Sequence, residues 1–292
     1  MYPWQEYRQP KSITEAIEDL STAPTPAVPI AGGTDLLLDM RQGRHPSVHT
    51  LIDLTGIPEM NVIETRGESL FIGACVSINR IINNPYVQKN AQALIEACDL
   101  IAGPQVRNIA TLGGNVAHAL PAADGTIALV AHDATAFVAH PGGVRQIRFQ
   151  ELFLGPGKSS IDKKTELIVG FSVPLTKPGQ ASAFKRIMRP QGVALPILNC
   201  AVWVERKGDK IVATRIAVGP GGPTPFRATN AENFIIGQDF NEENLSHTTE
   251  VLLEQGSFRT SPRRATSEYR KRILPVLFQG TFKEAWSRAN FE

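Results

Sequence analysis

PIAGGTDLLLDM, residues 29–40, places two adjacent glycines, Gly32 and Gly33, between an apolar run and a leucine-rich segment. One explanation is a turn, because glycine adopts positive φ without steric cost where a strand bends. A second is a bound phosphate, since a missing Cβ lets backbone N–H groups approach an anion beside the following helix. A turn needs only one glycine, but Gly-Gly is also common in loops, so this stretch alone leaves both explanations open.

The composition excludes several classes of protein. The chain has 292 residues, enough for two domains with separate cores. Its net charge is +2 and both signs are interspersed, so we expect no nucleic-acid partner and no polybasic membrane patch. The first ten residues lack the pattern of a signal peptide, and no apolar run approaches the roughly 18 residues of a membrane helix. We therefore expect a cytoplasmic protein with no direct membrane insertion.

Neither the cysteines nor the histidines have the spacing of metal ligands. Cys75, Cys98 and Cys200 form no C-x-x-C pair, which argues against a disulfide framework, a structural zinc site or an iron–sulfur cluster in this chain. His45 and His49 are four residues apart, but Pro46 disfavours the helix that would place them on one face. We expect no metal site.

Helix and strand patterns alternate through the first half. Ser12, with Glu15 three positions later, forms a capping box that predicts the start of an amphipathic helix. AVPI, residues 27–30, predicts a strand that ends at the first glycine pair, and the next segment predicts a helix that Gly43 stops. Two further segments, HTLIDL and SLFIGACVS, predict strands.

The remainder of the chain predicts more helices, then a change of domain. Residues 79–102 have a helical pattern that Asn83–Pro85 interrupts, and residues 126–132 and 135–139 predict a helix and a strand. VPLTKPGQ, residues 173–180, indicates a linker. After it come antiparallel strands that meet at the turn KGDK, followed by three helical segments. The expected fold class is α+β.

A second glycine pair, Gly113-Gly114 in LGGN, repeats the pattern of the first. Two unrelated turns would explain both pairs, but so would one extended diphosphate held by backbone N–H groups from two loops. Thr34, Thr111 and Asn115 would then add side-chain hydrogen bonds. Neither G-x-G-x-x-G nor G-x-x-x-x-G-K-[ST] occurs, so a dinucleotide fold other than the Rossmann fold is required.

Four segments together resemble the FAD-binding medium subunit of molybdenum hydroxylases, the group that includes xanthine dehydrogenase and carbon monoxide dehydrogenase. They are PIAGGTDLLLDM, RNIATLGGNVAHALPAADGTIALVAHDA, AFKRIMR and SEYRKRILPVLF. The resemblance implies an FAD-binding domain of the p-cresol methylhydroxylase type over residues 1–175, with lobes at about 1–57 and 58–175. It also implies a C-terminal domain of the carbon monoxide dehydrogenase flavoprotein type over residues 176–292.

The resemblance implies cofactor-binding residues but no catalytic residue. The implied FAD-binding residues are Pro29, Ile30, Ala31, Gly32, Gly33, Thr34, Asp35, Leu36, Ile101, Thr111, Leu112, Gly113, Gly114, Asn115, Asp124, Ile168 and Lys185. Asp124 would bind the nucleotide portion, although it also suits a helix N-cap. Ile101 and Ile168 would line the cofactor or belong to the core. Lys185 would stabilise reduced flavin near the ring, or be an exposed strand lysine.

The implied function is electron transfer within a larger complex. FAD would take electrons from a small partner subunit with two [2Fe–2S] clusters, supplied in turn by a large molybdenum-cofactor subunit, and would pass them to an external acceptor. The assembly could be a homodimer of heterotrimers. Two alternatives are a self-sufficient FAD-dependent oxidase or dehydrogenase and a non-catalytic nucleotide-binding module. Neither the substrate nor the acceptor follows from the sequence.

Overall fold

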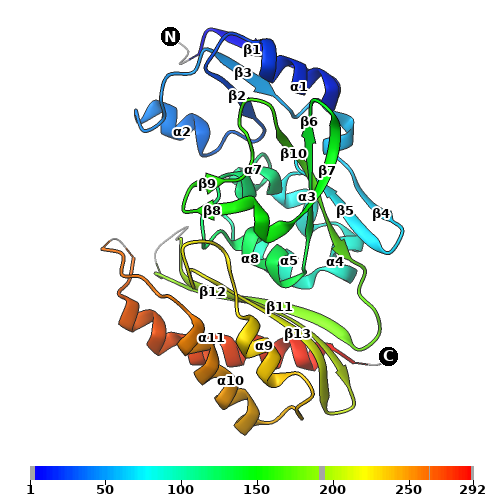
Figure 1. Cartoon of the computed structure of the whole chain (residues 1–292), viewed down its shortest axis with the longest axis vertical. Coiled ribbons are helices and arrows are strands. Elements are labelled where there is room, and N and C mark those ends of the chain that lie inside the picture. Colours follow the sequence, from blue (N-terminus) through cyan, green and yellow to red (C-terminus); the bar gives the residue numbers. More distant parts are fainter. Residues whose placement is uncertain (1–3, 191–194, 263, 291–292) are drawn as a thin grey trace.

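Three sheets are stacked along the long axis of the molecule (Figure 1). The computed structural model describes residues 4–190, 195–262 and 264–290. The strand orders are β1-β3-β2 in the first sheet, β4-β5-β10-β6-β7 in the second and β11-β12-β13-β14 in the third, with β8 and β9 forming a separate pair. The α+β class expected from the sequence is confirmed.

The first sheet is parallel and carries the first glycine pair at one strand end. Its elements in chain order are β1 (Glu6–Arg8), α1 (Ile13–Thr22), β2 (Ala27–Ile30), α2 (Leu36–Arg41) and β3 (Thr50–Asp53). The Ser12 hydroxyl accepts the N–H of Glu15, as the capping box predicts. In a complete capping box the Glu15 carboxylate would accept the N–H of Ser12, but here it accepts the N–H of Lys11.

The second sheet is antiparallel and has short helices against it. The elements are η1 (Pro58–Met60), β4 (Ile63–Arg66), β5 (Ser69–Gly73), α3 (Ile78–Ile82), α4 (Pro85–Asn90), α5 (Gln92–Asp99), α6 (Pro104–Arg107), α7 (Leu112–Ala117), α8 (Asp124–Ala131), β6 (Thr135–His140), β7 (Gly143–Arg148), η2 (Phe149–Leu152), β8 (Phe153–Gly155), β9 (Lys158–Ser159) and β10 (Leu167–Pro174). The predicted break at Asn83–Pro85 is confirmed, because Asn84 caps α4 and Pro85 is its first residue.

The third sheet belongs to the C-terminal part and is covered on one face by long helices. The elements are β11 (Gln180–Met188), β12 (Pro196–Lys207), β13 (Lys210–Gly219), β14 (Phe226–Arg227), α9 (Thr229–Ile235), α10 (Glu242–Gln255) and α11 (Ser267–Arg288). The hairpin predicted at KGDK is confirmed, since Lys207 and Lys210 are paired residues of β12 and β13.

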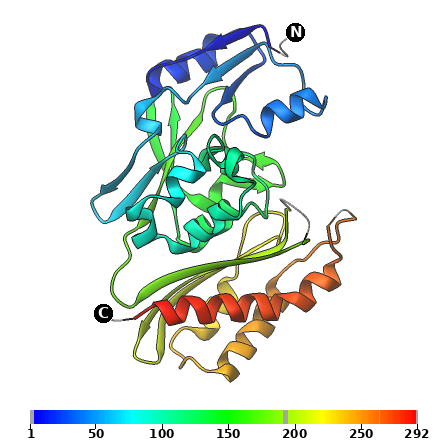
Figure 2. The ribbon, with the colours of Figure 1, turned by 180° about the vertical axis from the view of Figure 1, so that it is seen from behind.

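The third sheet packs against other elements on both of its faces (Figure 2). Phe184 and Ala201 point to one side and join the apolar core that contains α5 and α8. Their neighbours Ala183 and Cys200 point to the other side and join the core under α10 and α11. Because side chains alternate along a strand, one sheet serves two cores and couples the C-terminal part to the rest of the chain.

No helix in the described ranges is both long and apolar enough to cross a membrane.

His132 lies buried between α8 and β11. It is 2% exposed, and its Nε2 lies 3.3 Å from the Ser182 hydroxyl. That hydroxyl accepts the N–H of Ala93, so its own proton is available to the imidazole. Burial lowers the pKa of His132 from 6.5 to about 3, and the Arg215 charge acts in the same direction. The folded protein therefore holds this histidine neutral.

We expect His132 to make the folded state sensitive to mild acid. Between pH 6.5 and about 3 the unfolded chain binds a proton at this residue that the folded chain does not. The free energy of unfolding should therefore fall with pH by about 1.4 kcal/mol per unit across this window. Urea unfolding at pH 7 and pH 5 measures the effect in wild type and His132→Gln. Exposed His247, replaced in the same way, is the control, and an equal pH dependence in all three proteins contradicts the assignment.

Candidate functional site

The first glycine loop presents a run of unused backbone donors. It connects β2 to α2, and Gly33 has φ +65, a conformation that favours glycine. Within the described part of the chain, none of the backbone N–H groups from Ala31 to Leu36 donates a hydrogen bond. All of these residues except exposed Asp35 are partly exposed. Consecutive free N–H groups of this kind form an anion-binding concavity.

Gly32 is a glycine because of a contact within the protein. A Cβ there would lie 2.1 Å from the carbonyl oxygen of Ile109 and 2.9 Å from the Cα of Ala110. At Gly33 it would lie 2.9 Å from the Ile30 side chain. The two glycines of this pair thus have different causes, a close backbone contact at Gly32 and positive φ at Gly33.

The second glycine pair lies inside α7, and its N–H groups are already used. The Thr111 hydroxyl caps the helix by accepting the N–H of Gly114, and Gly113 donates to the carbonyl of Ala74 at 2.9 Å. A Cβ at Gly113 would lie 2.5 Å from that same carbonyl oxygen. The expectation that both loops supply free glycine N–H groups is therefore wrong for this one, because the sequence pattern does not reveal internal partners.

The second loop could contact a ligand through the exposed surface at Gly114 and the side chain of Asn115, since its glycine N–H groups are already bonded. Gly114 is exposed, and a Cβ there would meet only the Thr111 hydroxyl, at 3.2 Å. Asn115 Oδ1 is buried and has no partner among the described residues. An unpaired buried acceptor is unfavourable unless water or a ligand satisfies it.

The structure brings the two loops into contact. The backbone at Ile109 and Ala110, just before α7, lies against Gly32. Beyond α7, His118 Nδ1 lies 3.7 Å from Asp35 Oδ2. Ile109 is 57% exposed, which places an apolar side chain at the junction. The sequence patterns predicted that the two loops share a ligand, but they did not indicate these particular contacts, because the partners are far apart in the chain.

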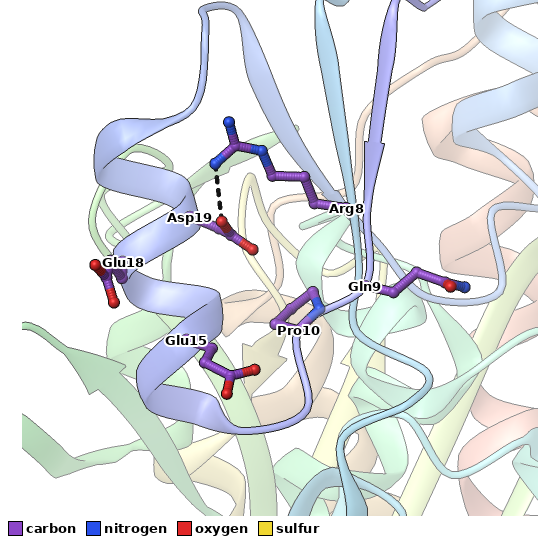
Figure 3. Close-up of a pocket in the computed structure, with 6 residues that line it drawn as sticks. All are labelled: Arg8, Gln9, Pro10, Glu15, Glu18 and Asp19. Carbon is purple, nitrogen blue, oxygen red and sulfur yellow. Dashed lines mark hydrogen bonds and ion pairs between the residues drawn. The ribbon is translucent and has the colours of Figure 1, made fainter.

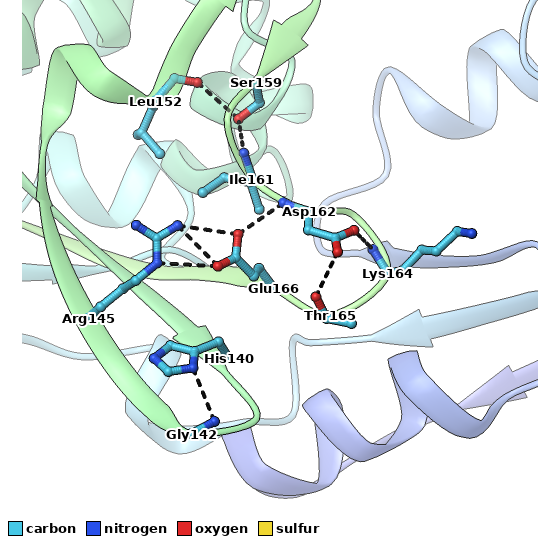
Figure 4. A network of polar contacts seen from close by, with 10 residues as sticks. All are labelled: His140, Gly142, Arg145, Leu152, Ser159, Ile161, Asp162, Lys164, Thr165 and Glu166. Carbon is cyan, nitrogen blue, oxygen red and sulfur yellow. Dashed lines mark hydrogen bonds and ion pairs between the residues drawn. The ribbon is translucent and has the colours of Figure 1, made fainter.

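Ile101 and Ile168 are both partly buried against the core of the second lobe. Ile168 also packs against the core beneath the first sheet, so it lies between two cores. Two residues before Ile168, Glu166 accepts hydrogen bonds at both of its carboxylate oxygens from Arg145 on β7 (Figure 4). Glu166 also accepts the N–H of Asp162, which fixes the turn that leads into β10.

Asp124 is a buried ion-pair partner and not a helix cap. It is the first residue of α8, where Ala123 is the N-cap and makes no side-chain bond. Asp124 Oδ2 accepts from Arg186 at 2.6 Å, and Oδ1 accepts from Asn199 at 2.7 Å. Both ion-pair side chains are 5% exposed. Burial raises the pKa of Asp124, and the Arg186 charge and the Asn199 hydrogen bond oppose this increase. Through these two partners the carboxylate links α8 to β11 and β12.

Lys185 lies apart from the glycine loops. Its neighbours Phe184 and Arg186 point toward the second lobe, so Lys185 points to the opposite face of the third sheet. Its Nζ lies 3.7 Å from the Glu284 carboxylate on α11, and its side chain is 45% exposed. The structure therefore places it as an exposed strand lysine, the alternative considered for it.

Neither the cavity at the first sheet nor the cysteine thiols contribute to the candidate site at the glycine loops. A cavity of about 430 Å³ lies between β1 and α1, lined by Arg8, Gln9, Pro10, Glu15, Glu18 and Asp19 (Figure 3), and no glycine-loop residue lines it. Burial raises the pKa of all three cysteine thiols, which are unpaired. In the ranges that the structure describes, no group of three His, Cys, Asp or Glu side chains could hold a metal.

Comparison with known proteins gives one consistent result. Residues 3–176 match the family model of the FAD binding domain in molybdopterin dehydrogenase, and residues 182–285 match the CO dehydrogenase flavoprotein C-terminal domain. The chain is 30% identical over 286 residues to the carbon monoxide dehydrogenase medium chain of Hydrogenophaga pseudoflava, covering 98% of each. It is 28% identical over 291 residues to a xanthine dehydrogenase FAD-binding subunit from Escherichia coli, covering 99% of this chain and 98% of the relative.

A solved structure shows the same fold. Carbon monoxide dehydrogenase from Hydrogenophaga pseudoflava, in a form lacking the Mo-pyranopterin moiety of the molybdenum cofactor, superposes with a TM-score of 0.92. The match is 30% identical in sequence and covers 99% of each chain.

We expect the glycines to differ in their effect on the stability of the cofactor-free chain. Gly32→Ala and Gly113→Ala force a Cβ against backbone carbonyls and should lower the free energy of unfolding by about 1–3 kcal/mol. Gly114→Ala adds a Cβ at an exposed helical position and should leave that free energy equal or slightly higher. Urea unfolding without FAD gives the three values, and losses of equal size would contradict the packing account.

Proposed function

This chain belongs to the family of FAD binding domains in molybdopterin dehydrogenases, and on that premise we propose that its first glycine loop holds the diphosphate of FAD. The protein is an FAD-binding subunit of the molybdenum hydroxylase type, an oxidoreductase component. The observation that carries the proposal is the run of unused N–H groups from Ala31 to Leu36.

The residues of the two loops fit a diphosphate in both charge and shape. Each phosphate carries oxygens that require several donors, and the free N–H groups supply them without a lysine or arginine side chain. Exposed Gly114 leaves room for a ligand to lie against α7. Asn115 Oδ1, which lacks a partner among the described residues, can only accept, so it would bond a hydroxyl or N–H group of FAD and not the diphosphate itself.

The other residues predicted from the sequence have different roles in the proposal. Ile109 supplies exposed apolar surface at the junction, and Ile101 and Ile168 would support the cofactor from the core side. The two oxygens of the Asp124 carboxylate already accept hydrogen bonds, so we propose that Asp124 supports the site by fixing α8 to the third sheet. We leave Lys185 out of this proposal, because its side chain lies beside Glu284 on α11, and a role near the flavin ring stays a prediction.

Bound FAD supplies the redox chemistry, accepting electrons and delivering them to an external acceptor. The chain itself binds and orients the cofactor and excludes water from part of its surface. We propose that the electrons come from a small subunit with two [2Fe–2S] clusters and originate at a large molybdenum-cofactor subunit. In this chain we assign the cofactor domain to residues 1–175 and the C-terminal domain to residues 176–292.

Gly114→Val tests the proposed cofactor site. The branched side chain would fill the space over α7 where the ligand approaches, so the Kd for FAD should rise at least tenfold while the cofactor-free fold persists. Flavin fluorescence titration of the full chain, stripped of cofactor, measures the Kd.

The matched control is Gly280→Val in α11, where a Cβ meets nothing within 4 Å. It should bind FAD like wild type. Unchanged FAD affinity in the folded Gly114 variant would remove α7 from the cofactor site.

A further inference from the structure

The turn between α5 and α6 contains a residue in a strained conformation. Ala102 has φ +47, in the left-handed region that is uncommon for residues other than glycine. It lies between Ile101 and Gly103, and Pro104 then begins α6. Strained backbone of this kind persists only where the surrounding structure holds it in place.

Arg107, the last residue of α6, holds this turn. Its Nη1 donates to the carbonyl oxygens of Asp99, Ile101 and Ala102, at 2.6, 3.2 and 3.0 Å. In the described part of the chain, no other side chain donates to these three carbonyls. The ion pair of Nη2 with Asp99 Oδ1 adds little, because the Asp99 side chain is 63% exposed. The guanidinium therefore acts mainly through the backbone carbonyls.

The Arg107 side chain is largely removed from water by these contacts. It is 13% exposed, and its Nε is buried and has no partner among the described residues. An arginine buried to this extent loses hydration that only its remaining hydrogen bonds replace. Its three carbonyl contacts are therefore the interactions that keep it in position.

The short helix α6 connects this turn to the backbone that contacts the first glycine loop. The N–H groups of Ile109 and Ala110 both donate to the carbonyl of Val106, which lies in α6. Gly32 lies against the same backbone, at the Ile109 carbonyl. Because α6 is a single turn of four residues, a displacement at its start reaches Ile109 directly.

The far side of α6 is fixed separately, by α3. Asn79 Nδ2 donates to the carbonyl of Pro104 at 3.2 Å and to Asn108 Oδ1 at 2.6 Å, and Ile78 donates its N–H to Ala110. These bonds hold the helix against the second lobe. They do not reach the carbonyls of the preceding turn, which are left to Arg107.

We propose that Arg107 is a positioning residue of the FAD site, because it fixes the Ile101–Ala102 turn and, through α6, the backbone on which the first glycine loop lies. The inference rests on the proposed function, in which Ile101 supports the cofactor and the first loop holds its diphosphate. Arg107 acts through these backbone contacts and does not itself bind the ligand. A guanidinium suits this task because it stays charged and donates in a fixed planar geometry.

Arg107→Gln and Arg107→Lys test the proposal in the full chain. Glutamine is too short to reach the three carbonyls, so the Kd for FAD should rise about tenfold or more. Lysine should restore the Kd to within about threefold of wild type, because an ammonium group donates up to three hydrogen bonds. Flavin fluorescence titration of the chain stripped of cofactor measures both values.

The matched control is Arg206→Gln. Arg206 also donates to backbone carbonyls, those of Gly208 and Trp286, and its side chain is 19% exposed. It lies beside the β12–β13 hairpin, which is at the opposite end of the molecule from the first sheet (Figure 1). This variant should bind FAD like wild type.

Hydrogen–deuterium exchange of the cofactor-free proteins separates this inference from FAD binding. The amides of Ile109 and Ala110 should exchange faster in Arg107→Gln than in wild type, and should be unchanged in Arg206→Gln. If wild type binds no FAD, the proposed function fails, and the exchange comparison still decides whether Arg107 positions this backbone.

The proposal is wrong if Arg107→Gln keeps the wild-type Kd, if Arg206→Gln weakens FAD binding equally, if lysine restores no affinity, or if exchange at Ile109 and Ala110 is unchanged. Should Arg107→Gln not fold, Ile101→Ala decides, because its side chain is partly exposed and the variant should fold. Its Kd for FAD should rise about threefold or more, and an unchanged Kd would remove the turn from the cofactor site.

Discussion

The close contact between Gly32 and the carbonyl of Ile109 determines how the first lobe meets the second. A side chain at Gly32 would push the loop away from the backbone that precedes α7. With none, the loop lies on that backbone, and its own N–H groups have no partners in the described chain. This backbone contact therefore lies at the junction of the lobes and beside the donor surface to which we assign the diphosphate.

A second set of contacts ties the C-terminal part to this junction. Asp124 joins α8 to Arg186 and Asn199, and both ion-pair side chains are almost completely buried. Glu96 on α5 receives a further ion pair from Arg288 at 2.6 Å. Removing one member of a buried pair leaves an uncompensated charge, so these contacts favour a single arrangement of the two parts.

Local features of the fold could be predicted from the sequence, and distant ones could not. The cap at Ser12, the break at Asn84 and the hairpin at KGDK depend on neighbouring residues, so propensity and turn chemistry suffice. Lys185 faces the side of the third sheet that does not pack against the second lobe. No local sequence pattern says which side that is. The pairing of Asp124 with Arg186 spans 62 positions and is equally hidden.

The glycine pairs illustrate the same limit within the candidate site. Sequence reasoning found both pairs and grouped them correctly in space, since Gly32 contacts the residues just before α7. It treated them as equivalent, whereas the first loop has free N–H groups and those of Gly113 and Gly114 are engaged. The difference arises from Ala74 and Thr111, whose roles as acceptors become visible only in three dimensions.

Hydrogen–deuterium exchange of the full chain with and without FAD tests most directly whether the first loop holds the diphosphate. In the cofactor-free chain, amides of residues 31–36 should exchange rapidly, because they have no acceptors. FAD should slow their exchange strongly, and should slow the amides of Gly113 and Gly114 much less, because those are already bonded. Exchange of residues 31–36 that is unchanged while FAD is bound would contradict the account.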